Sequence, residues 1–186
     1  MALRKLVGFA GSFNKPSRSR ALVDLVADLA AQRYGLVASV YDVADFGPSL
    51  GNARRAGDLD IKAQAILRDI AEADVLVVGT PTYKGSYTGL FKHVIDLIDP
   101  GALLGTPVIL TATGGGDRHA LIVEHQLRPL FGFFQAHALP SAIYAADRDF
   151  TDYQPAAEPI RQRARQAVAE LAPFVAAAQR APIAAE

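Results

Sequence analysis

Short apolar runs alternate with amphipathic helical patterns along the whole chain. The apolar runs, each of which predicts a strand, cover residues 5–10, 37–43, 75–80, 108–113 and 138–144. The helical patterns cover residues near 17–33, 60–73, 88–98, 120–134 and 157–178. The predicted strands are continuously apolar, as expected for parallel strands that are covered by helices on both faces. The alternation therefore predicts a doubly wound α/β fold, a three-layer sandwich around a parallel sheet.

The length and composition of the chain limit the classes of protein to which it can belong. With 186 residues the chain has the size of one domain, and we expect residues 1–186 to form a single domain. The 19 basic and 19 acidic side chains cancel, which argues against binding to nucleic acid or to a membrane surface. There is no cysteine, which excludes disulfides and thiol catalysis. Because no signal peptide and no membrane-spanning run is recognisable, we expect a cytoplasmic location.

A loop rich in hydroxyl groups and cations, residues 11–20, joins the first predicted strand to the first predicted helix. Lys15, Arg18 and Arg20 crowd the start of that helix, where cations oppose the positive end of the helix dipole. An anion bound between them, such as a phosphate ester, explains this arrangement best. The alternative is an ordinary surface loop in which Ser17 caps the helix. The loop has neither the P-loop spacing nor the G-x-G-x-x-G fingerprint, which leaves a mononucleotide phosphate site.

Two further strand ends carry unusual loops, residues 80–89 and 113–119. In a sheet with the strand order 2-1-3-4-5, these loops and the first one lie side by side at the carboxyl edge. In the first of the two, Pro81 fixes the exit from the strand and Tyr83 offers a ring face, which suits a flat heterocycle. Three consecutive glycines in the second permit a tight backbone around a planar ring. The alternatives are a turn in which Thr88 caps the next helix, and flexible punctuation between two elements.

Together, the three loops closely resemble those of the flavodoxin-like NAD(P)H-dependent FMN reductases. The most similar branch supplies reduced FMN to two-component alkanesulfonate and methanesulfonate monooxygenases. The resemblance covers roughly residues 5–150 and rests on Gly11-Ser12…Ser17-Arg18-Ser19, on residues 80–92 and on Thr113-Gly-Gly…His119. It implies a flavodoxin-like three-layer sandwich with a five-stranded parallel sheet, the cofactors FMN and NADPH (or NADH), and an FMNH2-dependent monooxygenase as partner.

The resemblance also assigns roles to individual residues. It implies that the FMN phosphate is held by Ser12, Ser17, Arg18 and Ser19. It implies that the isoalloxazine ring is bordered by Pro81, Thr82, Tyr83, Lys84 and Gly85. It implies that the pyrimidine side and the dimethylbenzene approach are lined by Thr113, Gly114, Gly115 and His119. No catalytic side chain is expected, because hydride passes directly between two bound rings.

Other functions share the same loops. A flavoprotein of this fold can keep FMN tightly bound and reduce quinones, azo compounds or metal oxyanions directly. An electron-shuttling flavodoxin-like protein is a further alternative, against which the zero net charge argues because such proteins carry a strongly acidic surface. The choice between NADPH and NADH is open, since the sequence has no nicotinamide-nucleotide motif. The four histidines lie on different predicted elements, so we expect no metal site.

The predicted helix over residues 120–134 is apolar nearly all round. A helix that packs only on a sheet needs one apolar stripe, so we expect this one to form a homo-oligomer interface, in a dimer or a tetramer. Pro129 cannot donate a hydrogen bond to the carbonyl of His125, which predicts a kink or a π-bulge near His125. The alternative is that Pro129 ends the helix early. The two-component reductases carry a π-helix at a tetramer interface, often marked by a tyrosine whose position His125 takes here.

Overall fold

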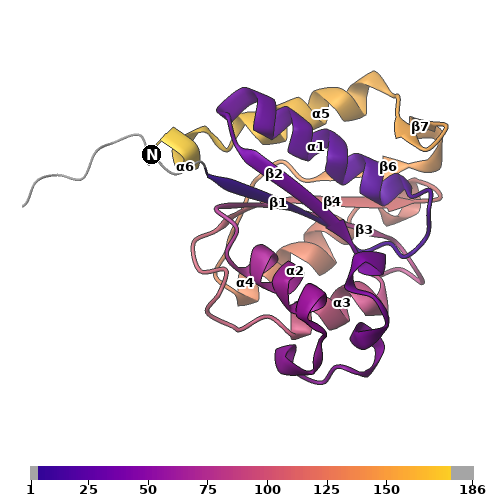
Figure 1. Cartoon of the computed structure of the whole chain (residues 1–186). Helices are drawn as coiled ribbons and strands as arrows, with labels where there is room; N and C mark the ends of the chain where they lie inside the picture. The colour runs from indigo at the N-terminus through magenta and orange to yellow at the C-terminus, as the bar shows by residue number, and fades with distance from the viewer. Residues whose placement is uncertain (1–3, 177–186) are drawn as a thin grey trace, which may run out of the picture.

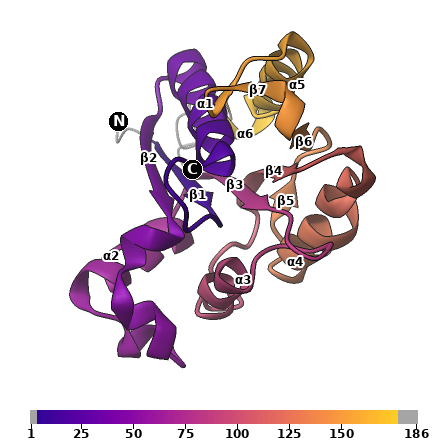
Figure 2. The ribbon, with the colours of Figure 1, turned by 90° about the vertical axis from the view of Figure 1, so that its right-hand side faces the viewer.

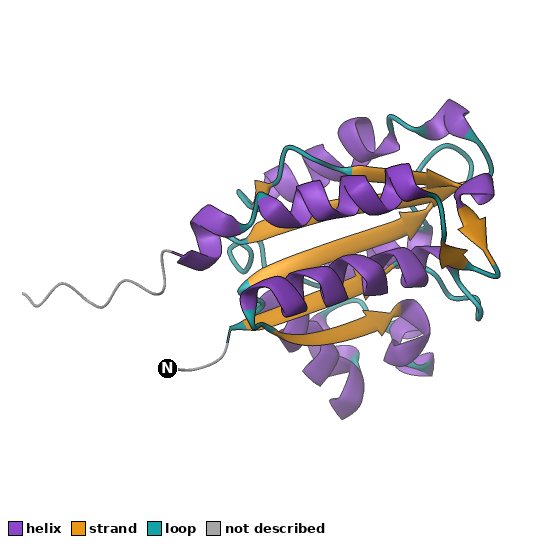
Figure 3. Ribbon diagram, turned by 90° about the horizontal axis from the view of Figure 1, so that it is seen from above, coloured by secondary structure: helices purple, strands orange, loops and turns teal. Residues whose placement is uncertain are grey.

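One parallel sheet forms the centre of the molecule in the computed structural model, which describes residues 4–176. The strands of this sheet are β1 (Lys5–Ala10), β2 (Val37–Asp42), β3 (Val75–Pro81), β4 (Pro107–Gly114), β5 (His137–Ala138) and β6 (Ile143–Ala146). The order is β2-β1-β3-β4-β5, with β6 also paired to β4, and every pairing is parallel (Figure 3). The predicted flavodoxin-like strand order is therefore confirmed, with a sixth strand added to it.

Helices cover both faces of the sheet, as predicted (Figures 1 and 2). One face carries α1 (Arg18–Tyr34), α5 (Glu158–Ala169) and α6 (Ala172–Ala176), and the other carries α2 (Ile61–Ala71), α3 (Gly89–Asp96) and α4 (Arg128–Phe133). The short 3-10 helices are η1 (Val43–Phe46), η2 (Pro48–Asn52), η3 (Ala56–Asp58), η4 (Asp117–His119) and η6 (Asp147–Asp149). A hairpin of β7 (Phe150–Thr151) and β8 (Gln154–Pro155) follows η6. Each face has its own apolar cluster, so the sheet is buried on both sides.

The predicted fifth strand over residues 138–144 is wrong as a continuous element. It is divided into β5 and β6 by residues 139–142, although both parts pair with β4. Pro140 has no N–H group with which to continue the ladder. The guanidinium of Arg128 instead donates to the carbonyls of Ala138 and Leu139 at 3.1 and 3.0 Å. A buried Ser141 completes the break by donating from its backbone N–H and its hydroxyl to Glu170.

The predicted helix over residues 120–134 is divided as well. A π-helix, η5 (Val123–Leu127), runs directly into α4, so the predicted π-bulge near His125 is confirmed. The alternative, in which Pro129 ends the helix, is wrong because α4 continues to Phe133. The extra residue of a π-turn moves aside the carbonyl with which the proline ring would clash.

The predicted last helix over residues 157–178 is also two elements. It begins as α5, ends at Ala169, and restarts as α6 one turn later. Pro173 lies at the start of α6, a position that suits proline because the N–H groups of the first helical turn have no intrahelical acceptor. The predicted positions 177 and 178 lie outside the described residues.

Two glycines allow α1 to approach the sheet closely. A Cβ atom added at Gly79 would lie 2.5 Å from Val23 Cγ2 and 2.6 Å from Thr111 Oγ1. A Cβ atom added at Gly8 would lie 2.7 Å from Val23 Cγ1. Because Val23 is fully buried between these strands and its own helix, it has no room to move aside. The position of α1 over β1 and β3 therefore depends on the absence of a side chain at Gly8 and at Gly79.

We expect Gly79→Ala to lower the free energy of unfolding by about 1–3 kcal/mol, because the added methyl group overpacks the contact with Val23. Urea denaturation followed by circular dichroism measures the change. Gly89→Ala is the matched control, since nothing lies within 4 Å of its added Cβ at the first turn of α3. Equal losses in the two variants would contradict the close approach of α1.

Candidate functional site

The carboxyl ends of β1, β3, β4 and β6 surround a cavity of about 480 Å³. Its lining comprises Ser12, Asn14, Lys15, Pro16, Ser17, Arg18, Ser19, Pro81, Thr82, Tyr83, Thr113, Gly114, Gly115, Asp147 and Tyr153. The three loops therefore lie side by side, as the strand order predicted. All predicted site residues line this cavity except Lys84, Gly85 and His119. Their role in binding stays a prediction.

Hydrogen bonds tie the three loops to one another at the floor of the cavity. The hydroxyl groups of Ser19 and Thr113, both buried, lie 2.6 Å apart and join the first loop to the third. The N–H of Thr82 donates to the carbonyl of Thr113 at 2.7 Å. The hydroxyl of Thr88 donates to the carbonyl of Gly11, also at 2.7 Å, which joins the second loop to the first. The cavity is thus walled by loops that hold one another in place.

The start of α1 forms one wall of the cavity. Ser17 is the N-cap, and its hydroxyl accepts a hydrogen bond from the N–H of Arg20 at 3.1 Å. Ser17 therefore caps the helix, as expected if the first loop were an ordinary surface loop. This cap does not use the N–H groups of Arg18 and Ser19, which lie in the first turn and have no intrahelical acceptor. These two donors, with the positive end of the helix dipole, remain available to an anion in the cavity.

The cations of the first loop have different roles. Arg20 does not line the cavity, so the interpretation in which it shares an anion with Arg18 is wrong. Its guanidinium lies 3.0 Å from Asp24 and 3.2 Å from Asp42, and it also donates to the carbonyl of Val40. Burial and the neighbouring Asp45 raise the pKa of the Asp42 carboxyl, an effect that Lys15 and Arg20 oppose. Arg20 thus serves to neutralise a buried carboxylate at the end of β2.

Arg18, in contrast, faces the cavity. Its guanidinium lies 3.5 Å from a carboxylate oxygen of Asp147 and 4.8 Å from the centre of the Tyr153 ring. Within residues 4–176, two buried side-chain polar atoms have no hydrogen-bond partner, Arg18 Nε and Thr82 Oγ1. Both belong to residues that line this cavity. Because buried polar groups are nearly always satisfied in proteins, these two atoms mark places where a ligand can bond.

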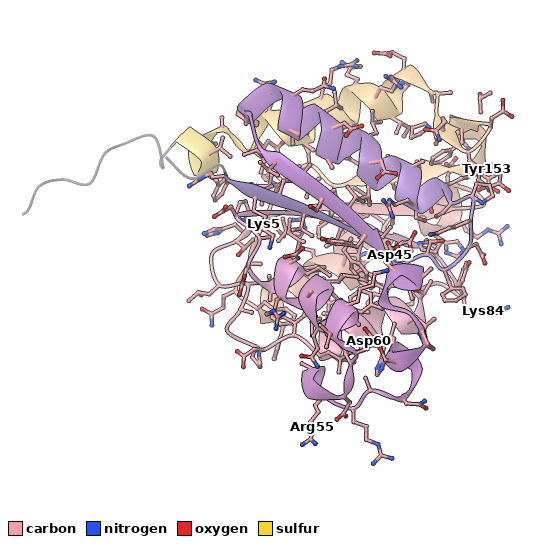
Figure 4. The ribbon with its side chains drawn as sticks, in the orientation of Figure 1. Lys5, Asp45, Arg55, Asp60, Lys84 and Tyr153 are labelled. Atoms are coloured by element: carbon pink, nitrogen blue, oxygen red, sulfur yellow. The ribbon has the colours of Figure 1, made fainter. Side chains whose placement is uncertain are left out.

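A tight turn in the middle of the second loop explains why Lys84 and Gly85 lie outside the lining. Tyr83 and Ser86 exchange two backbone hydrogen bonds, of 2.9 and 3.1 Å. Lys84 and Gly85 form the tip between them, with left-handed φ angles of 53° and 84°. Lys84 therefore projects outward, at the same end of the molecule as Tyr153 (Figure 4). His119 ends η4, beyond the glycines that border the cavity.

Sequence reasoning missed five lining residues. Asn14, Lys15 and Pro16 belong to the first loop, where Lys15 was expected beside an anion but was not among the residues assigned to the phosphate. Asp147 and Tyr153 follow β6, and the loop that contains them has no recognisable motif. The signal that could have found Asp147 and Tyr153 is their position after the last parallel strand. The carboxyl end of a fifth parallel strand reaches the same edge of the sheet, so the polar and aromatic side chains after it belonged among the candidates.

Among residues 4–176, histidine and carboxylate side chains nowhere gather in groups of three or more that could hold a metal ion. Within the same range, every helix is too short or too polar to cross a membrane.

The fold is that of a flavodoxin-like protein, and its cavity lies at the carboxyl edge of the sheet, where ligands bind in such folds. The chain belongs to the NADPH-dependent FMN reductase family, whose model matches residues 4–151. It is accordingly an NAD(P)H:FMN oxidoreductase, with FMN and a nicotinamide nucleotide as its cofactors.

Individual relatives are similar over nearly the whole chain. The NADH-dependent FMN reductase SfnF of Pseudomonas fluorescens is 45% identical, over 91% of each chain. An FMN reductase (NADPH) of Pseudomonas aeruginosa is 44% identical, again over 91% of each chain. An X-ray structure of an oxidoreductase from Corynebacterium diphtheriae superposes with a TM-score of 0.84 at 31% identity, covering 94% of this chain and 98% of that one. The two curated relatives differ in the nucleotide named, so this comparison leaves the choice between NADH and NADPH open.

We expect Thr82→Val to stabilise the ligand-free protein by about 1 kcal/mol, because valine removes a buried hydroxyl that has no partner. The same change is expected to weaken FMN binding about three- to tenfold, by removing a hydrogen bond to the ligand. Thermal unfolding and fluorescence quenching measure the two effects. Thr111→Val is the matched control: its buried hydroxyl donates to Val78 at 3.0 Å, so its loss destabilises. A destabilised Thr82→Val would contradict the ligand role of this hydroxyl.

Proposed function

We propose that this FMN reductase releases reduced FMN to a partner monooxygenase, in a two-component system for the desulfonation of alkanesulfonates or methanesulfonate. FMN supplies the chemistry when it is bound, because its ring accepts a hydride from the nicotinamide nucleotide. The expected cytoplasmic location belongs to this proposal, since both nucleotides are supplied there. The substrate of the partner enzyme is inferred from the resemblance of the loops to that branch of the family.

The π-helix is the observation that carries this proposal. Its residue Gln126 accepts a hydrogen bond from the hydroxyl of Ser86 at 3.0 Å, so η5 is joined to the loop that borders the proposed ring site. The two-component reductases, which this chain resembles, have a π-helix in the same part of the sequence. A change in η5 is thereby coupled to the loop around the flavin. His125 occupies the position of the tyrosine that often marks this π-helix.

The residues of the cavity suit an FMN molecule whose phosphate lies at the start of α1. We assign the phosphate to Ser12, Ser17, Arg18 and Ser19, the ring to Pro81, Thr82 and Tyr83, and its polar edge to Thr113, Gly114 and Gly115. The unpartnered Nε of Arg18 is a donor, as a phosphate requires, and the unpartnered hydroxyl of Thr82 can bond to a ring heteroatom. Lys84, Gly85 and His119 are kept as rim residues, outside the lining.

Tyr144 holds the glycine loop against the proposed ring site. Its hydroxyl donates to the carbonyl of Gly116 at 2.5 Å. A Cβ atom added at Gly114 would lie 2.3 Å from the same hydroxyl oxygen, so only glycine fits there. Burial raises the pKa of the Tyr144 phenol, and the carboxylates of Asp117 and Asp147 raise it further, which keeps the phenol protonated and able to donate.

We expect FMN to behave as an exchangeable substrate, with a Kd of about 1 μM or weaker, as is usual for enzyme substrates. Purified protein is then expected to lose FMN on gel filtration and to oxidise NADPH or NADH only when FMN is added. Fluorescence quenching measures the affinity for oxidised FMN, and an anaerobic titration measures it for the reduced form.

A different result assigns a different role to the same site. FMN that stays bound in stoichiometric amount through gel filtration would make it a prosthetic group. The direct acceptor would then be a quinone, an azo compound or a metal oxyanion, and the release of reduced FMN to a partner would be refuted. Failure of both nucleotides to reduce bound flavin would instead leave an electron shuttle.

We also propose that residues 120–134 form a homo-oligomer interface, in a homotetramer by resemblance to the two-component reductases. Leu121 and Phe133 are large apolar side chains that are 62% and 67% exposed. Phe133 borders a groove of about 450 Å³ whose other apolar walls are Ile95, Ile98, Pro100, Leu130 and Phe134. Large exposed apolar side chains, one of them beside an apolar groove, are typical of an interaction site. Because η5 contacts the flavin loop through Gln126, such an interface lies next to the proposed site.

We expect Phe133→Glu to produce a smaller assembly, because a carboxylate in a desolvated apolar interface has no partner there. Multi-angle light scattering after gel filtration measures the mass. Ile61→Glu is the matched control: Ile61 is 86% exposed at the start of α2, and α2 lies at the opposite edge of the same helical layer from α4 (Figure 2). An unchanged mass for Phe133→Glu, or an equal loss in both variants, would refute this interface.

A further inference from the structure

The β7–β8 hairpin forms a wall of the cavity and has an unusual tip. Thr151 pairs with Gln154, and the two residues between them, Asp152 and Tyr153, have left-handed φ angles of 48° and 64°. Such primed two-residue turns normally carry Asn-Gly or a similar pair, since a residue with a Cβ atom is disfavoured in this conformation. A tyrosine here is rare. A strained residue of this kind at a ligand site is reason to look for a function.

The strained conformation places the Tyr153 ring against Arg18. The guanidinium carbon of Arg18 lies 4.8 Å from the ring centre, within the range of a cation–π contact. Tyr153 is 40% exposed, so burial of an apolar ring does not explain its position. Asp147, from the same part of the chain, lies 3.5 Å from the same guanidinium. The segment that follows β6 therefore fixes the orientation of Arg18 with two side chains.

The contact between Tyr153 and Arg18 leaves the donor capacity of Arg18 open. A ring face uses none of the five N–H groups of the guanidinium. Arg18 Nε is buried and, within residues 4–176, has no acceptor. The family model matches residues 4–151, so Tyr153 lies beyond the matched segment. The hairpin tip is thus a feature of this chain for which the family match gives no role.

We propose that Tyr153 is a positioning residue, which holds Arg18 ready for a phosphate group and so makes the site select FMN over the unphosphorylated riboflavin. The proposal rests on the phosphate site proposed above at the start of α1. Tyr153 acts through Arg18 and does not itself contact the flavin ring. Its contribution is therefore expected only for ligands that carry a phosphate.

The test compares the dissociation constants of FMN and riboflavin, measured by fluorescence quenching. We expect Tyr153→Leu to weaken FMN binding about three- to tenfold and to leave riboflavin unchanged, whereas Tyr153→Phe keeps the ring and the affinity. Arg18→Gln is expected to weaken FMN alone. In the double variant, Tyr153→Leu is expected to add no further loss, because the partner through which it acts is gone. Arg148→Gln, an exposed arginine outside the cavity lining, controls for charge.

Each contrary outcome has a distinct meaning. An equal loss of FMN and riboflavin affinity in Tyr153→Leu, or a loss that adds fully to that of Arg18→Gln, would overturn the positioning role while the phosphate site stands. An unchanged FMN affinity in Arg18→Gln would overturn the phosphate site and the positioning role with it. Tyr153→Gly separates function from folding: it relieves the left-handed strain, so its melting temperature is expected to match or exceed that of the wild type while its selectivity falls. A lower melting temperature with unchanged selectivity would make Tyr153 structural.

Discussion

The site depends on hydrogen bonds that continue the sheet beyond the ends of its strands. The N–H of Gly11 donates to the carbonyl of Gly79 at 2.6 Å, and the N–H of Thr82 donates to that of Thr113 at 2.7 Å. Each bond joins a loop to the neighbouring strand or loop, so none of the three can move without the others. A Cβ atom added at Gly11 would lie 2.7 Å from Phe91 Cβ. The backbone of the first loop can therefore pass this close to Phe91 only because residue 11 is a glycine. Backbone geometry, more than side-chain identity, therefore shapes this cavity.

Much of the fold follows from apolar runs and their order. β1 has the predicted bounds, and the predicted bounds of β2, β3 and β4 are off by one residue at one end or both. β1, β3 and β4 are buried and read as nearly continuous apolar runs, whereas β2 is a partly exposed edge strand. The fifth strand was predicted with the wrong shape. Its apolar run contains Pro140, and the break there is stabilised by Arg128, which lies on α4. The apolar run gives no sign that its carbonyl groups accept hydrogen bonds from an arginine in a different segment of the chain.

The site was predictable to the extent that its residues belong to loops with a distinctive composition. Serines and glycines at strand ends indicated the first and third loops, and both line the cavity. Lys84 and Gly85 were assigned to the ring because they continue the motif; a turn closed by Tyr83 and Ser86 places them outside the cavity lining, and their role in binding stays a prediction. Tyr153 had no motif to indicate it. Its position depends on a short hairpin whose two turn residues have left-handed φ angles. The sequence around Tyr153 does not predict this turn.

The charge of the cavity is consistent with the proposal that FMN binds there and exchanges. A phosphate monoester carries about −1.5 to −2 charges at neutral pH. Two cations line the cavity, and each already has a carboxylate nearby: Lys15 lies 3.9 Å from Asp42, and Arg18 lies 3.5 Å from Asp147. The start of α1 adds about half a positive charge. The site thus offers a phosphate fixed donors and a well-oriented guanidinium without full charge compensation. A site of this kind would recognise a phosphate by geometry and hold it moderately, which supports the proposal that FMN is released.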